Sequence, residues 1–121
     1  MPDDFEIRKA HVDFITDPSV RGAYEVLESA GRHAHWKIRL TNPPVPSVDY
    51  FDVIGDWLYS FIPNQTDLLF YVRKPALKKD PSLRVFAQAN FEFAENPAGE
   101  TQIRVRNQAT AEKIADWLIR V

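Results

Sequence analysis

The hydrophobic and polar positions along the chain follow two different periods. In several tracts apolar residues alternate with polar ones or form a short apolar run, which is the pattern of a strand with at least one buried face. These predicted strands cover residues 35–40, 68–72, 83–93 and 101–105. A weaker alternation at residues 5–7 and 12–14 permits one further short strand near the N-terminus.

Three other tracts have the spacing of helices. Asp17 and Pro18 form a start signal, because the carboxylate can accept a free backbone N–H and proline suits the first helical position. This helix should end near Gly31, where glycine favours a stop. A second helix is predicted over residues 48–62 behind a capping serine, and a third from Ala109 to the C-terminus.

Together these elements predict an α+β fold in a single domain that covers residues 1–121. Asn96–Pro97–Ala98–Gly99 has turn chemistry and would join the last two strands as a hairpin. Short links between successive strands indicate an antiparallel sheet. We therefore expect about four antiparallel strands, with roughly three helices packed mainly on one face.

Composition narrows the classes of protein that the chain can represent. Hydrophobic residues make up 45% of the 121 positions, which is typical of a globular domain rather than a disordered one. The sequence has no cysteine, so disulfides and thiolate chemistry are excluded. The acidic start Met1–Asp4 lacks the long apolar run of a signal sequence, and no tract is long enough for a membrane span. We expect a cytoplasmic protein without contact to membranes.

The tract 48–62 is the most unusual predicted element. Its apolar residues leave only a narrow polar strip, whereas a surface helix normally shows one apolar stripe. Such an element must be covered on two sides, either by the rest of the domain or by another chain. Aromatic residues are enriched at binding hot spots. The expected partner-binding residues are Tyr50, Trp57, Asp52 and Asp56, with the aromatic pair as anchors and the carboxylates facing basic groups of the partner.

The polar face of the predicted sheet offers an alternative site. Arginines and aromatic rings on one face resemble the surfaces that bind single-stranded nucleic acid, where bases stack on rings and phosphates pair with arginine. The residues expected there are Arg84, Phe86, Arg104, Arg106, Tyr71, Lys37 and Arg39. The formal net charge of −2 weighs against this alternative, because phosphate neutralisation supplies most nonspecific affinity.

Candidates for catalysis and metal binding are weaker. Asp49, Asp52 and Asp56 would share a helical face, yet carboxylates at the start of a helix need no function to be stable there. His33 and His35 form an H-x-H pair that can chelate zinc, but Lys37 and Arg39 continue the same face and oppose a cation. No phosphate-binding glycine loop or nucleophile elbow is present. We therefore assign no catalytic residue, metal or cofactor, although an enzyme remains open.

Three functions follow in order of preference. The first is a small protein-binding domain, such as an inhibitor, an immunity-type antidote or an adaptor, that acts by occlusion or dimerisation. A charge distribution that is acidic in the first half of the chain and basic in the second suits a partner guided by electrostatics. The second is a nucleic-acid-binding sheet, and the third is a small hydrolase or isomerase that uses the His33/His35 region.

Overall fold

The computed structural model describes residues 3–32, 36–42 and 45–120. Over these residues the chain forms five helices and one antiparallel sheet of six strands. In chain order the elements are α1 (Asp4–Phe14), α2 (Pro18–Gly31), β1 (Lys37–Thr41), β2 (Ser47–Phe51), β3 (Trp57–Pro63), β4 (Leu68–Val72), α3 (Lys74–Lys79), α4 (Ser82–Asn90), β5 (Phe93–Glu95), β6 (Thr101–Val105) and α5 (Gln108–Arg120). The α+β class and the antiparallel sheet predicted from the sequence are confirmed, with more strands and helices than expected.

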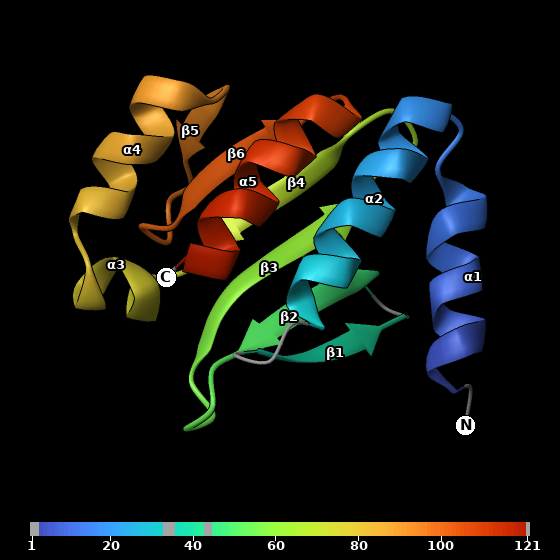
Figure 1. Cartoon of the computed structure of the whole chain (residues 1–121), viewed down its shortest axis with the longest axis horizontal. Coiled ribbons are helices and arrows are strands. Elements are labelled where there is room, and N and C mark those ends of the chain that lie inside the picture. The colour runs from blue at the N-terminus through green and yellow to red at the C-terminus, as the bar shows by residue number, and fades with distance from the viewer. Residues whose placement is uncertain (1–2, 33–35, 43–44, 121) are drawn as a thin grey trace.

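The strand order in the sheet is β1-β2-β3-β4-β6-β5. The first four strands follow one another as antiparallel neighbours. The chain then leaves the sheet to form α3 and α4 at one end of the molecule, and returns so that β6 pairs with β4 and β5 lies at the edge (Figure 1). This excursion places α3 and α4 beside the turn between β2 and β3.

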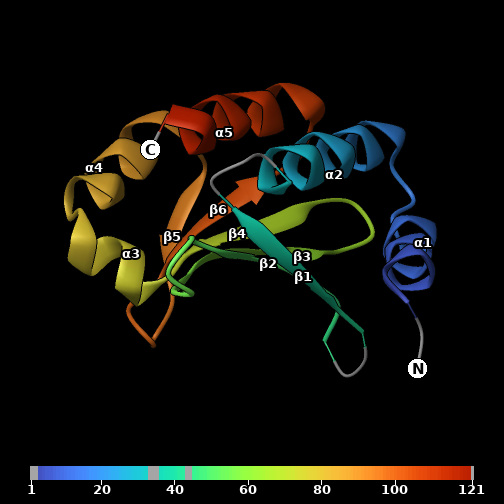
Figure 2. The same cartoon turned by 60° about the horizontal axis from the view of Figure 1, so that its bottom comes forward.

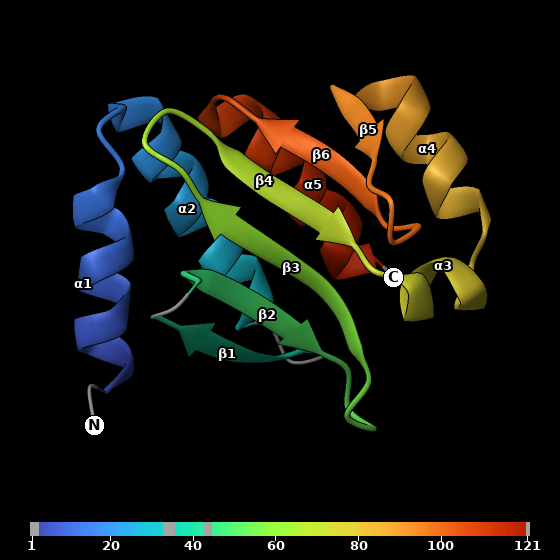
Figure 3. The ribbon, with the colours of Figure 1, turned by 180° about the vertical axis from the view of Figure 1, so that it is seen from behind.

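Helices α2 and α5 lie side by side over one face of the sheet (Figure 2). The core fills the space between them and the strands, and its largest fully buried side chains include Tyr24, Leu27, Tyr50, Phe61, Phe70, Ile114 and Leu118. The opposite face of the sheet has none of the described helices over it, as the view from behind shows (Figure 3). A strand in this arrangement therefore points alternate residues into the core and toward the uncovered face.

The helix predicted after Asp17 is confirmed. The Asp17 carboxylate accepts hydrogen bonds from the backbone N–H groups of Ser19 and Val20, at 2.8 and 3.2 Å, and Pro18 occupies the first turn. The C-terminal helix is also confirmed, as are strands over most of 35–40, over 68–72 and over 101–105. These elements combine a clear period with chemistry that fixes their ends, which is why the sequence was sufficient for them.

The helix predicted over residues 48–62 is wrong. The tract forms β2, a turn and β3, and Gly55 in the turn has a φ of 97°, a conformation that favours glycine. β-Branched and aromatic side chains dominate the tract and favour strands. β2 and β3 lie in the middle of the sheet, where one face packs on the core and the other carries half-buried apolar side chains beside polar ones, so the tract lacks the broad polar side of a surface helix.

The strand predicted over residues 83–93 is also wrong over most of its length. Residues 82–90 form α4, and only β5 remains extended. Leu83 and Ala87 are buried while Val85 is 65% exposed, so the tract follows a helical period. The apolar residues at odd-numbered positions of this tract do not distinguish a strand from a helix, because residues four apart share a face in both structures.

The strand considered near the N-terminus is a helix as well. Asp3 caps α1 by accepting a hydrogen bond from the N–H of Glu6 at 2.9 Å. Buried His11 fastens α1 to the rest of the fold, since its ring nitrogens lie 2.9 Å from the Tyr24 hydroxyl and 2.8 Å from the Thr41 carbonyl oxygen. In the described part of the chain every helix is too short or too polar to span a lipid bilayer.

Candidate functional site

The uncovered face of the sheet collects the side chains that alternate with the core positions of the strands. We call this surface the open face. The strand register aligns Arg39, Asp49, Ser60, Tyr71 and Gln102 across five strands in one continuous row. The open face consists of Lys37, Arg39, Thr41, Ser47, Asp49, Phe51, Trp57, Ser60, Ile62, Leu69, Tyr71, Gln102 and Arg104.

A buried carboxylate organises the β1 side of the open face. Asp49 is 1% exposed, and its Oδ1 accepts hydrogen bonds from the hydroxyls of Ser47 and Ser60 at 3.1 and 2.8 Å. Its Oδ2 accepts two more from Arg39, from Nε at 3.0 Å and from Nη2 at 2.8 Å. Both carboxylate oxygens are thus used, which compensates for the burial of a charge and fixes the guanidinium in place.

Two aromatic rings lie beside this arginine. Phe51 and Trp57 stack with their centroids 5.9 Å apart, and the Arg39 guanidinium lies over both rings, at 5.0 and 4.8 Å. Arg73, just after β4, lies 3.9 Å from the Trp57 ring centroid and donates to the Trp57 carbonyl at 2.8 Å. We call these four residues the arginine–aromatic cluster. Cation–π contacts of this kind hold half-exposed rings in defined positions.

A shallow depression lies next to the cluster. It has a volume of about 400 Å³, and Ile62 and Tyr71 supply its apolar surface. Arg73 and Glu100 border it and form an ion pair of 3.2 Å. Tyr71 is half-buried, and this burial raises the pKa of its phenol, so the hydroxyl stays protonated at neutral pH. Leu69 is half-buried beside Ile62 in the register, so the centre of the open face is apolar.

The β6 side of the open face is charged but balanced. Arg104 pairs with Asp67 at 2.7 Å and with Glu92 at 3.4 Å. Arg106, beyond the end of β6, also pairs with Glu92, at 2.9 Å. Around the apolar centre, nearly every cation therefore has a carboxylate as its neighbour.

The structure separates the residues predicted to bind a partner. Trp57 lies on the open face, half-buried. Tyr50 lies in the core with no exposed surface, and its hydroxyl donates to the Leu27 carbonyl, so it cannot contact a partner of the folded domain. Asp52 and Asp56 lie in the β2–β3 turn, where both pair with Lys79, at 3.0 and 2.8 Å. The three aspartates do not share a helical face, because Asp49 is on β2 instead.

The residues of the predicted nucleic-acid surface also fall into two groups. Lys37, Arg39, Tyr71 and Arg104 lie on the open face, and Arg106 lies at its border. Arg84 and Phe86 lie on α4 instead, because that tract is helical. His33 and His35 are outside the described residues.

Sequence reasoning missed several residues of this surface. Phe51 and Ile62 lie in the tract 48–62, which the sequence predicts as an apolar helix, and Leu69 lies in the apolar run 68–72. The signal that could have found them is the two-residue alternation of 47–51 and 59–62, in which Asp49 and Ser60 occupy positions between core residues.

Comparisons of the chain with protein-family models, with curated proteins and with solved structures find no match.

Proposed function

We propose that this domain binds protein through its open face, and that the partner is a second copy of the same chain. The observation that carries the proposal is a half-exposed apolar centre of Trp57, Ile62, Leu69 and Tyr71 on a sheet face that no described helix covers. An apolar, aromatic centre within a polar rim is the common anatomy of a protein interface. Tryptophan, tyrosine and arginine are also the residues that most often dominate binding energy.

The balance of charge on this face supports self-association. The cations on this face and along its border are Lys37, Arg39, Arg73, Arg104 and Arg106, and the carboxylates are Asp49, Asp67, Glu92 and Glu100. A surface that carries both signs in near balance can face a copy of itself without net repulsion. In a two-fold dimer the same patch meets itself, so complementarity of this kind is required. Pairing would cover both open faces and withdraw their rings from water.

Trp57 acts as the anchor in this proposal, and Asp52 and Asp56 lose the role that the sequence suggested. Both carboxylates are occupied by Lys79 and lie in the β2–β3 turn. Arg39 and Arg73 hold the indole in place before the partner arrives, which lowers the cost of ordering it on binding.

Sedimentation velocity over a range of concentrations tests the proposal. The wild-type protein should sediment as a dimer, and Trp57→Ala as a monomer at the same concentrations. Phe5→Ala is the matched control, because Phe5 is an aromatic residue on α1 that is 75% exposed and lies away from the open face. Circular dichroism confirms that each variant is folded. A wild-type monomer at all concentrations, or a folded Trp57→Ala protein that still dimerises, would overturn the proposal.

A second candidate function is binding of single-stranded nucleic acid on the same face. The arginine–aromatic cluster favours it, since rings and guanidinium groups together form stacking platforms for bases. The pairing of Arg39, Arg73 and Arg104 with carboxylates weighs against it, because these cations are not free to bind phosphates. Retardation of a labelled oligonucleotide that weakens steeply with added salt would support this alternative.

A further inference from the structure

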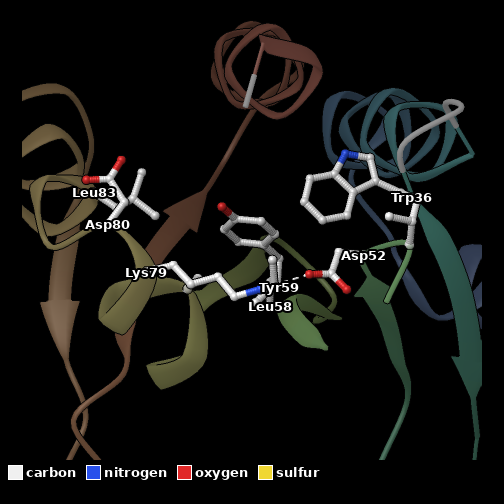
Figure 4. A pocket seen from close by; sticks show the side chains of 9 residues that line it. Trp36, Asp52, Leu58, Tyr59, Lys79, Asp80 and Leu83 are labelled. Carbon is white, nitrogen blue, oxygen red and sulfur yellow. Dashed lines mark hydrogen bonds and ion pairs between the residues drawn. The ribbon is translucent and has the colours of Figure 1, made fainter. Parts of the chain in front are cut away.

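A separate cavity of about 340 Å³ lies where α3 and α4 approach the β2–β3 hairpin (Figure 4). Its apolar walls come from Trp36, Leu58, Ala76 and Leu83. Leu58 follows Trp57 directly in β3 but lines this cavity, whereas Trp57 belongs to the open face. The volume and the apolar lining are typical of a site for a small molecule.

Tyr59 supplies a buried polar group to this cavity. The residue is 3% exposed, and its ring packs against Trp36, Phe70 and Trp117 at centroid distances of 5.4, 6.0 and 5.6 Å. Figure 4 shows its hydroxyl pointing into the space between Trp36 on one side and Asp80 with Leu83 on the other. Among the described residues nothing donates to this hydroxyl or accepts from it. The hydroxyl is therefore available for a hydrogen bond to a ligand in the cavity.

Negatively charged side chains outnumber positively charged ones among the described residues that line the cavity. Lys79 lines it, but its ammonium is already bonded to the carboxylates of Asp52 and Asp56. Asp80 lines it too, and within the described chain no cation pairs with its carboxylate. The Oδ1 atom of Asp80 accepts from the N–H and the hydroxyl of Ser82, at 3.1 and 2.6 Å, which leaves Oδ2 available.

The negative charge of Asp80 also affects the pKa of Tyr59. Burial, with a smaller contribution from the Asp80 carboxylate, raises the pKa of the Tyr59 hydroxyl to about 12. The hydroxyl is therefore protonated at neutral pH, and its oxygen can accept a hydrogen bond from a ligand.

We propose that this cavity binds a small amphipathic amine. The apolar body of the ligand would lie against Trp36, Leu58 and Leu83, and its ammonium group would donate to the Asp80 carboxylate and the Tyr59 oxygen. An anionic ligand fits less well, because Lys79, the cation among the described lining residues, is already paired with Asp52 and Asp56. The site is distinct from the open face and does not depend on the function proposed there.

Titrations followed by ligand-observed NMR or calorimetry test this assignment with defined probes. Tryptamine and 2-phenylethylamine carry the amine, whereas 3-phenylpropionate and 2-phenylethanol present a similar body with an anion or a neutral hydroxyl. The amines should bind with at least about tenfold higher affinity than either analogue, since a charge-assisted hydrogen bond is about twice as strong as a neutral one. Equal binding of amine and alcohol, or stronger binding of the carboxylate, would overturn the proposal, as would the absence of amine binding at millimolar concentrations.

Variants locate the site. Asp80→Asn keeps an acceptor for Ser82 but removes the charge, and should weaken amine binding about tenfold or more; Tyr59→Phe should weaken it about fivefold. Asp116→Asn on α5 removes an exposed carboxylate away from this cavity and should have no effect. Trp57→Ala should also bind amines normally, which separates this test from that of the open face. Unchanged affinity in both folded cavity variants would refute the assignment.

Discussion

Replacement of Asp49 by alanine should destabilise the fold more than any substitution of an exposed charge. The carboxylate accepts four hydrogen bonds, two from the hydroxyls of Ser47 and Ser60 and two from Arg39. Alanine leaves both hydroxyls without this acceptor in a buried row, and it frees the guanidinium that lies over Phe51 and Trp57.

The size of the effect follows from the exposure of each partner. Each hydroxyl that loses its bond contributes about 1 kcal/mol. The Arg39 side chain is 51% exposed, so water screens part of its ion pair, and its two bonds together contribute about 1 kcal/mol rather than the full value of a buried pair. The free energy of unfolding should therefore fall by about 3 kcal/mol in Asp49→Ala. Asparagine retains the shape of the side chain and some of the hydrogen bonds, so the free energy of unfolding should fall by about half as much in Asp49→Asn.

Urea unfolding followed by tryptophan fluorescence measures these differences. All proteins must be compared at one concentration, because self-association would add to the apparent stability. Asp13→Ala is the control, since Asp13 is an exposed residue that pairs with Lys9, and its loss should change stability by less than about 0.5 kcal/mol. If Asp49→Ala is no less stable than this control, the row does not organise the open face as described.

Two further predictions concern the helices that hold the sheet. Burial is the main cause that lowers the pKa of His11 in the folded state, opposed by the hydrogen bond to Thr41 and by Glu28. The unfolded chain then binds more protons than the folded one below pH 6.5, so stability should fall on acidification by up to about 1.4 kcal/mol per pH unit. His11→Gln should flatten this dependence in urea unfolding between pH 7 and 5, and an unchanged slope would contradict the assignment. In α2, a Cβ at Gly31 would lie 2.6 Å from Ile38 Cγ2 and 2.8 Å from Tyr50 Cε2, so Gly31→Ala should lower stability by about 1–3 kcal/mol. A Cβ at Gly22 would contact the side chain of Gln108, which can move aside, so Gly22→Ala should leave the stability measured by thermal unfolding unchanged or raise it. A similar loss of stability in Gly31→Ala and Gly22→Ala would refute the packing argument.

The elements that could be predicted from the sequence are those in which period and end signals agree. The α2 helix has a carboxylate cap, a proline in its first turn and an apolar stripe, so its local chemistry and its packing point the same way. The strands β4 and β6 likewise combine alternation or an apolar run with clear boundaries. The helix prediction for 48–62 failed because the many apolar residues of the tract fit either period, and only its β-branched and aromatic composition and the short alternations at 47–51 and 59–62 favoured strands.

The open face could be predicted only in part. Alternation places Lys37 and Arg39 on one side of a strand, and Gln102 and Arg104 on one side of another. It does not give the register, which decides that Arg39 meets Asp49 and that Tyr71 lies between Ser60 and Gln102. Register depends on the turns and on the core packing of all strands together. The cavity at Tyr59 could not be predicted for the same reason, because its lining residues come from β3, α3, α4, the β2–β3 turn and the segment before β1.

Single cysteines placed on the open face test most directly whether this face is where two copies meet. The chain has no cysteine of its own, so Tyr71→Cys and Gln102→Cys each introduce one thiol at a half-buried position of the central row. Under mild oxidation at least one of them should form a covalent dimer rapidly, and Trp57→Ala in the same background should abolish it. Val85→Cys, on the exposed side of α4, is the control and should react slowly. Rapid cross-linking through position 85, with none through the open face, would contradict the central claim.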